Sequence, residues 1–174
     1  MVTVYVERGA TFSELKRLTR EGRTTLIHFP YDEGDRSFFY GRWNKYLYRA
    51  RSSLVTCDTT QLTFDEDILI SDMEGSSLYR KIQKIVGRES EHDVRHLDAA
   101  YKSKADAFLT QDKRDIVRNR AELEQLIGLR IFHSDDDRVE FLEFVERHVV
   151  GERSLSEGQS MVSLGRADEL HPEG

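Results

Sequence analysis

The 174-residue sequence has one cysteine, two prolines and no long hydrophobic run. The single cysteine, Cys57, cannot form a disulfide within the chain, and we expect a buried, unreactive thiol in a reducing cytoplasm. No apolar stretch approaches the roughly 20 residues that cross a bilayer, and the N-terminus lacks the residue order of a secretory signal. These absences predict a soluble, cytoplasmic protein without a membrane partner.

Short contiguous active-site motifs are also missing. The sequence contains no P-loop, no G-x-S-x-G motif and no internal repeat. His28 and His92 have no partner at the spacing typical of zinc ligands, and His96, beside Leu97 on a helix, is expected to be a packed core residue. A catalytic site would therefore have to be assembled from residues that are far apart in the sequence.

The length predicts one domain of ordinary size, which we place at residues 1–150. Residues 151–174 are polar and show no hydrophobic period, which predicts a flexible acidic tail. The net charge of −6 is concentrated near the C-terminus, because residues 134–174 hold 11 acidic residues and four arginines. The rest of the chain is nearly neutral, and its clusters of lysine and arginine suit either a phosphate backbone or solvated helix faces.

The first 30 residues predict a strand, a helix and a second strand. Residues 2–6 alternate valine with other side chains, and the spacing of Thr11 and Glu14 matches a capping box at the start of a helix. Residues 24–29 form the second strand, which Pro30 ends. This order is typical of a right-handed parallel crossover. Acidic residues follow both strands: Glu7 after the first, and Asp32, Glu33 and Asp35 after the second.

A second helix and strand lie in the middle of the chain. Residues 93–101 have apolar side chains at helical spacing, and residues 105–110 form a short apolar run typical of a buried strand. Asp93 begins this helix and Asp112 follows this strand, so both acids are expected at the edge of the sheet where open α/β folds bind ligands. The sequence therefore predicts an α/β fold, a three-layer sandwich with a central, mostly parallel sheet. Further expected elements are helices at 65–74, 78–86 and 115–127, a strand at 129–133 and a closing helix at 139–148.

The middle segment resembles the PIN-domain family of metal-dependent ribonucleases. The resemblance lies in D-x-x-H-L-x-A-A, which starts at Asp93, and in A-D-x-F-L-T-x-D-K, which ends at Lys113. It covers about residues 91–148 well and the first half of the chain loosely. It implies a site for Mg²⁺ or Mn²⁺ in which four carboxylates hold the metal and catalyse cleavage: Glu7, Glu33, Asp93 and Asp112. Glu7 stands where the family usually has aspartate, and Glu33 is preferred to Asp32 because the family favours glutamate there.

Carboxylates from several elements suit this chemistry, because hard divalent cations need oxygen ligands and must leave room for water and a substrate phosphate. The same acids also have simpler explanations. Asp93 is placed to cap its helix and to complement the helix dipole, and Asp112 is placed to cap the turn that begins near Lys113.

Residues 36–63 interleave aromatic and basic side chains, a composition suited to single-stranded RNA. We expect packing for Phe39 and Trp43. RNA contacts are expected for Tyr40, Arg42, Tyr46 and Lys113. In a rival register, residues 54–57 form a strand that ends at Asp58, but too few residues then separate it from Asp93.

Two functions follow. The first is a divalent-metal-dependent nuclease that hydrolyses phosphodiester bonds in RNA, with Asp93 and Asp112 as its most sensitive positions. The second is a catalytically lapsed PIN-fold protein that binds nucleic acid or protein, which the glutamate at position 7 favours. The resemblance also allows for a toxin-type role, an inhibitory protein partner and a homodimer.

Overall fold

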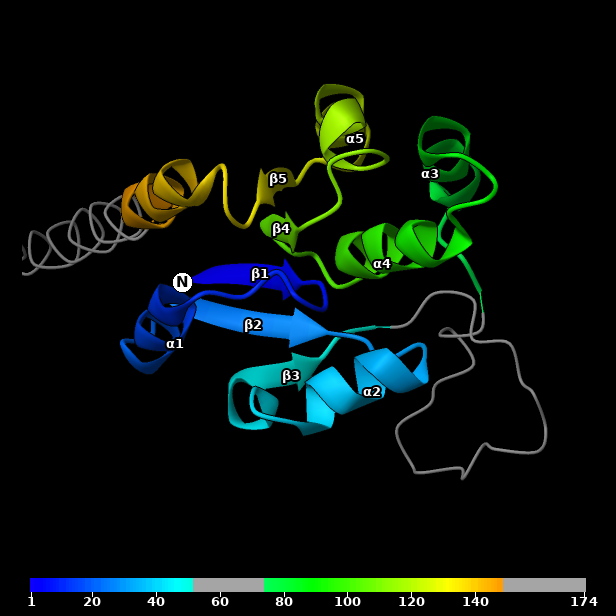
Figure 1. Cartoon of the computed structure of the whole chain (residues 1–174). Coiled ribbons are helices and arrows are strands. Elements are labelled where there is room, and N and C mark those ends of the chain that lie inside the picture. The colour runs from blue at the N-terminus through cyan, green and yellow to red at the C-terminus, as the bar shows by residue number, and fades with distance from the viewer. Residues whose placement is uncertain (52–73, 149–174) are drawn as a thin grey trace, which may run out of the picture.

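The computed structural model describes residues 1–51 and 74–148. In this part of the chain, five strands form one parallel sheet in the order β3-β2-β1-β4-β5 (Figure 1). The strands are β1 (Val2–Val6), β2 (Thr24–His28), β3 (Leu47–Arg49), β4 (Ala107–Thr110) and β5 (Arg130–His133). The expected α/β sandwich with a central parallel sheet is confirmed.

Helices cover both faces of this sheet (Figure 1). One face packs against α1 (Ser13–Arg20) and against the helical residues 138–148. The other face packs against α3 (Tyr79–Val86), α4 (Glu91–Lys102) and α5 (Arg120–Ile127). Shorter elements are α2 (Glu33–Tyr40) and the 3₁₀ turns η1 (Asn44–Tyr46) and η3 (Val117–Asn119). No helix within the described ranges combines the length and hydrophobicity that crossing a bilayer requires.

Two hydrophobic cores lie on opposite faces of the sheet. On the α4 face, the rings of Tyr5 and Phe108 stack with centroids 5.3 Å apart. On the other face, Phe132 meets the edge of Phe141 at 5.4 Å. Because helices cover both sides of a parallel sheet, its strands are buried on both sides, which explains why every residue of β1 except Thr3 is buried.

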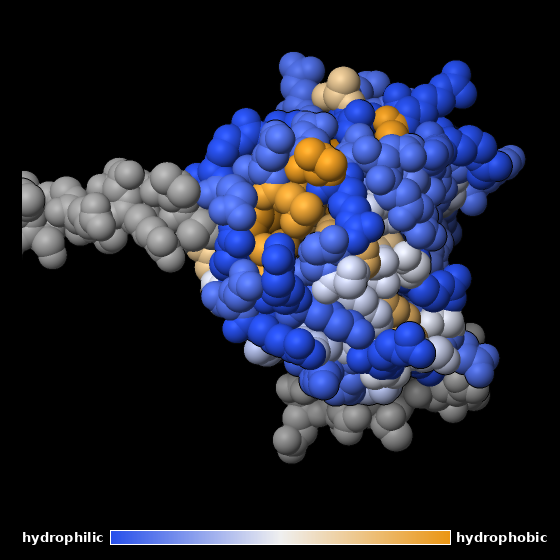
Figure 2. Space-filling model, turned by 60° about the vertical axis from the view of Figure 1, so that its left-hand side comes forward, coloured by the Kyte–Doolittle hydropathy of each residue, from blue (hydrophilic) through white to orange (hydrophobic). Residues whose placement is uncertain are grey.

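The outer surface is mostly polar. Figure 2 shows the side that carries α1 and the 138–148 helix, where hydrophilic residues surround a small apolar patch. The exposed large hydrophobic side chains of residues 1–51 and 74–148 are Met1, Tyr40, Tyr48 and Val139. Scattered exposure of this kind is normal for a folded domain.

The strand order reverses between β1 and β4. The chain moves outward from β1 through β2 to β3, and then returns to place β4 on the other side of β1. In open α/β sheets, ligands bind at the carboxyl ends of the strands at such a reversal. The residues that follow β1 and β4 are therefore where a site should lie.

Several boundaries differ from those expected. The Thr11–Glu14 capping box does not form. The N-cap residue of α1 is Phe12, whose side chain makes no capping hydrogen bond, and the Ser13 hydroxyl donates to the Glu14 carboxylate instead. The helix expected at 115–127 begins only at Arg120, because a 3₁₀ turn precedes it. Strand β3 is a further element that the sequence did not indicate. Four expectations lie outside the described residues: those for Cys57, for the rival strand 54–57 with Asp58, for most of the helix 65–74 and for the tail 151–174.

Gly128 offers a test of the α5–β5 turn. It ends α5 in the left-handed conformation with φ 72°, and its N–H donates to the Glu124 carbonyl. A Cβ there would meet nothing within 4 Å, so the cost of Gly128→Ala is conformational alone. We expect Gly128→Ala to lower the free energy of unfolding by about 1 kcal/mol in urea titrations, and Gly128→Asn to lower it less, because asparagine tolerates this conformation. Equal losses for both variants would contradict this account.

Candidate functional site

Glu7 and Asp112 meet at the carboxyl edge of the sheet through Thr110. Glu7 directly follows β1, and its N–H donates to the Leu109 carbonyl of β4. The buried Thr110 hydroxyl donates to Glu7 Oε2 (2.5 Å) and its oxygen accepts the N–H of Asp112 (2.8 Å). One threonine side chain therefore fixes both the glutamate after β1 and the turn after β4.

Two further carboxylates join this edge. Asp93 lies in the first turn of α4, and it offers one oxygen within 4.8 Å of oxygens from Asp112 and Asp115. The Asp112 carboxylate accepts the N–H of Asp115 at 2.7 Å, which closes the turn after β4. We call Glu7, Asp93, Asp112 and Asp115 the acidic centre. Its members come from the ends of β1 and β4 and from the start of α4.

The charges of the acidic centre disturb one another. Burial, and then the charges of Asp93 and Asp112, raise the pKa of Glu7 to about 8, although the Thr110 hydrogen bond acts in the opposite sense. Burial and the charge of Asp112 likewise raise the pKa of Asp93. Negative charge is thus confined where water solvates it poorly, and a bound cation would relieve it. The donor set, all carboxylate oxygen, fits Mg²⁺ or Mn²⁺.

Asp115 is the member of the acidic centre that was not predicted from the sequence. Its two oxygens accept from the Arg114 guanidinium at 3.0 and 2.8 Å, and the Ser90 hydroxyl donates to one of them at 2.9 Å. These hydrogen bonds hold the pKa of Asp115 below its ordinary value. The available signal was the D-x-x-D spacing after a strand, which also marks an ordinary turn.

The choice of Glu33 is not supported by its position. Glu33 is exposed in the first turn of α2, and its charge is not among those that shift the pKa of Glu7 or Asp93. Asp32 is the N-cap of α2 and accepts the N–H of Asp35 at 2.7 Å. That cap sets the helix so that Asp35, three residues later, is the acid that turns inward and is fully buried.

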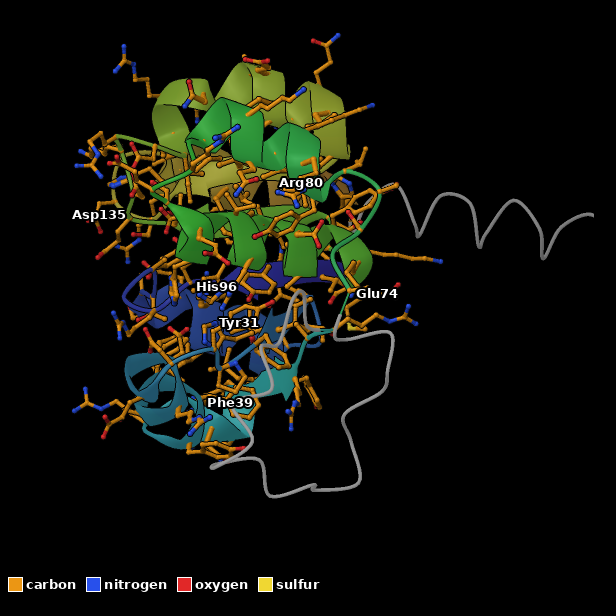
Figure 3. All side chains as sticks on the ribbon, turned by 90° about the vertical axis from the view of Figure 1, so that its right-hand side faces the viewer. Tyr31, Phe39, Glu74, Arg80, His96 and Asp135 are labelled. Carbon is orange, nitrogen blue, oxygen red and sulfur yellow. The ribbon has the colours of Figure 1, made fainter. Side chains whose placement is uncertain are left out.

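Asp35 forms a second cluster with three histidines. Its Oδ2 lies 3.1 Å from His92 Nε2 and 3.2 Å from His96 Nε2, and its Oδ1 lies 3.8 Å from His28 Nε2. We call Asp35, His28, His92 and His96 the histidine cluster. Figure 3 shows His96 beside Tyr31 where α4 crosses the sheet, and their ring centroids are 5.0 Å apart.

The histidine cluster corrects two sequence-based expectations. His92 does have a partner at helical spacing, His96 four residues later on α4, and both His28 and His92 also face Asp35 of α2. His96 is a buried residue, as expected, but it faces a carboxylate and another imidazole as well as the core. The signal that was available is the spacing of His92 and His96, because residues four apart share one face of a helix.

Charge within the histidine cluster is unevenly held. Burial alone would raise the pKa of Asp35, but hydrogen bonds from His92 and His96 keep it well below its ordinary value. The hydrogen bond to Asp35 raises the pKa of His92. Burial lowers the pKa of His96, and burial with the His96 charge lowers that of His28 to about 4. His92 is thus the histidine on which a proton is best stabilised.

The residues expected to touch RNA are placed differently from one another. Tyr40 is 62% exposed and Arg42 is exposed, so both are accessible. Tyr46 is a correction, because it is only 5% exposed, packs against Trp43 and accepts a hydrogen bond from Arg20. Lys113 is exposed but forms an ion pair with Asp136 at 2.6 Å. The expected packing of Trp43 is confirmed by its burial.

Comparisons of the chain with protein-family models, with curated proteins and with solved structures find no match. The function of both clusters therefore has to follow from their own chemistry. Of the four sequence-predicted metal ligands, Asp93 and Asp112 offer oxygens within 4.8 Å of each other, and Glu7 is close enough for their charges to raise its pKa.

Proposed function

We propose that the protein is a nuclease that uses Mg²⁺ or Mn²⁺ at the acidic centre to hydrolyse phosphodiester bonds in RNA, in the manner of the PIN-like enzymes that its sequence resembles. The observation that carries the proposal is the meeting of carboxylates from β1, α4 and β4 at the point where the strand order reverses. A single cysteine fits a reducing cytoplasm, where RNA is available.

Glu7, Asp93 and Asp112 are the residues that would hold the metal. When bound there, such an ion polarises a phosphodiester and makes its water a better nucleophile. Thr110 keeps the Glu7 carboxylate and the Asp112 backbone in place, so the ligands are oriented before the cation arrives. The side chains of Arg8 and Arg114 are 52% and 83% exposed, and they offer cationic contacts for the phosphates of a long substrate.

One observation favours the alternative, a PIN-fold binding module without catalysis. Asp115 is already held by Arg114 and Ser90, and one oxygen of Asp112 accepts a backbone N–H. Internal partners of this kind stabilise carboxylates without a metal. The two functions differ in whether a divalent cation binds the acidic centre.

Mn²⁺ binding separates them. We expect calorimetric titration of the chelator-treated protein to show Mn²⁺ binding, and Asp112→Asn to weaken it at least about tenfold, because a charged ligand is lost. The matched control is Asp106→Asn. Asp106 precedes β4 at the opposite end of the sheet and accepts the N–H of Thr3, which asparagine can also accept. Mn²⁺ binding that survives Asp112→Asn unchanged would remove the acidic centre as its site.

A further inference from the structure

We propose that Asp35, His92 and His96 form a second metal site, which binds a transition-metal ion of the Zn²⁺ class and is chemically distinct from the acidic centre. The site lies between α2 and α4, and the ligand atoms are Asp35 Oδ2 and Nε2 of the two histidines. His92 and Asp93 are neighbours on α4, so the two sites share that helix and no ligand.

The distances between the three ligand atoms match those around one tetrahedral ion. They are 3.1 and 3.2 Å from Asp35 Oδ2 to the two nitrogens, and 3.3 Å between the nitrogens themselves. Zinc lies about 2.0–2.1 Å from nitrogen and oxygen ligands, and a tetrahedral angle then separates neighbouring ligands by about 3.3 Å. The three atoms therefore need almost no rearrangement to hold such an ion.

Hydrogen bonds alone explain this arrangement less well. A carboxylate oxygen only accepts, so bonds from both rings to Asp35 Oδ2 require a hydrogen on each Nε2. Those two hydrogens would then converge on one oxygen from nitrogens that are 3.3 Å apart. A single cation among the three atoms replaces this crowding by three attractive contacts.

Two buried polar atoms beside the site are a separate observation that points to a ligand. Among the residues that the structure describes, His28 Nε2 and Asp35 Oδ1 have no hydrogen-bond partner. His28 is fully buried, and its ring stacks on His96 with centroids 5.4 Å apart. Its Nδ1 donates to the Val6 carbonyl at 2.9 Å, which leaves the Nε2 lone pair directed at the cluster. Buried polar atoms usually have a hydrogen-bond partner, and these two lie 3.8 Å from each other beside the three ligand atoms, so they favour a charged occupant in the cluster.

The surroundings of the ligands also resemble those of metal-binding histidines. Nδ1 of His96, the ring nitrogen that faces away from Asp35, contacts the Tyr5 hydroxyl at 2.7 Å, and that hydroxyl accepts the N–H of Phe29 at 3.2 Å. Partners of this kind fix the orientation of an imidazole ligand. His92 is 43% exposed and gives the ion a route from solvent. Two imidazoles with one carboxylate suit Zn²⁺, whereas the all-carboxylate acidic centre suits Mg²⁺ or Mn²⁺.

The test is Zn²⁺ binding to the chelator-treated, full-length protein, measured by calorimetry. We expect one ion per chain at this site. His92→Ala should weaken its binding by about 100-fold or more, because losing a residue that only hydrogen-bonds a metal ligand already costs about 10–100-fold. Co²⁺ provides a second readout, because a tetrahedral nitrogen and oxygen site gives it much stronger visible absorption than water does. His92→Ala should abolish that absorption.

The control for histidines in general is His148→Ala, because His148 is also exposed but lies on the 138–148 helix, on the opposite face of the sheet. Asp112→Asn should leave Zn²⁺ binding at this site unchanged, so a failed acidic centre and a failed histidine site give different results.

If His92→Ala does not fold, judged by circular dichroism, Asp35→Asn replaces it, and Zn²⁺ should then raise the unfolding temperature of the wild type only. Absence of bound Zn²⁺, or equal binding by wild type and variant, would show that the cluster holds protons alone.

Discussion

Replacement of Asp93 or Asp112 by asparagine is expected to lower the rate of RNA cleavage by about 10²-fold or more, because each change removes a charge that positions the metal and its water. The measurement is cleavage of an end-labelled single-stranded RNA in Mn²⁺ or Mg²⁺, with each variant purified in parallel with the wild type. Parallel purification matters because a contaminating ribonuclease would cleave equally in every preparation.

The Asp93 variant carries its own check on folding. Burial and the nearby Asp112 charge raise the pKa of Asp93, so its ionised form is disfavoured in the metal-free protein. Asp93→Asn should therefore unfold at the same or a higher temperature than the wild type, while its activity falls. A variant that is both inactive and unstable would point to a structural role for Asp93, whose charge complements the dipole at the start of α4.

Asp106→Asn is the matched control for cleavage as well. It changes the same functional group near the same strand but at the opposite end of the sheet. Full activity of Asp106→Asn together with loss in Asp93→Asn and Asp112→Asn would assign the reaction to the carboxyl edge. Undiminished cleavage by the latter two variants would contradict the nuclease proposal and leave the binding module.

The order of strands and helices is enough to predict at which edge of the sheet Glu7, Asp93 and Asp112 lie. Glu7 directly follows the buried strand β1, Asp112 is the second residue after β4, and Asp93 lies in the first turn of the helix that leads to β4. Element order brings such residues to one edge whatever their side-chain conformations are. Asp115 depends instead on the turn after Asp112, and a turn is shaped by hydrogen bonds that the sequence does not specify uniquely.

The choice among Asp32, Glu33 and Asp35 could not be settled in the same way. A shift of one residue rotates a side chain by about 100° around a helix, so the exact start of α2 decides which acid turns inward. The Asp32 cap fixes that start, and the buried acid is Asp35. The partners of Asp35 come from β2 and α4, and such contacts between distant elements have no fixed sequence spacing.

Tyr46 shows a similar limit for the aromatic segment. Arg42 and Lys45, which precede Tyr46 in the sequence, are exposed, and the composition of the segment suits base stacking. The 3₁₀ turn η1 instead directs its ring into the core beside Trp43. Composition indicates what a segment can contact, but the local turn decides which side chains remain available.

Glu7→Gln is expected to stabilise the metal-free protein at alkaline pH by a few kcal/mol, because each pKa unit corresponds to about 1.4 kcal/mol. Burial and the charges of Asp93 and Asp112 raise the pKa of Glu7 from 4.5 to about 8 in the folded protein. Below pH 4.5 the glutamate is protonated in both the folded and the unfolded chain, so it does not change the free energy of unfolding. Between pH 4.5 and 8 only the unfolded chain releases the proton, and stability falls as the pH rises.

Urea titrations in chelator from pH 5 to 9 measure this effect as the difference between variant and wild type. That difference should grow up to about pH 8 and then level off. Glu33→Gln is the matched control, since the exposed Glu33 side chain meets water in the folded and the unfolded chain alike. The same Glu7→Gln change should weaken Mn²⁺ binding, because the carboxylate that destabilises the metal-free site is the one that attracts the cation. If the difference in the free energy of unfolding between variant and wild type stays constant across the pH range, Glu7 is well solvated. The argument that burial of Glu7 favours cation binding at the acidic centre would then fail.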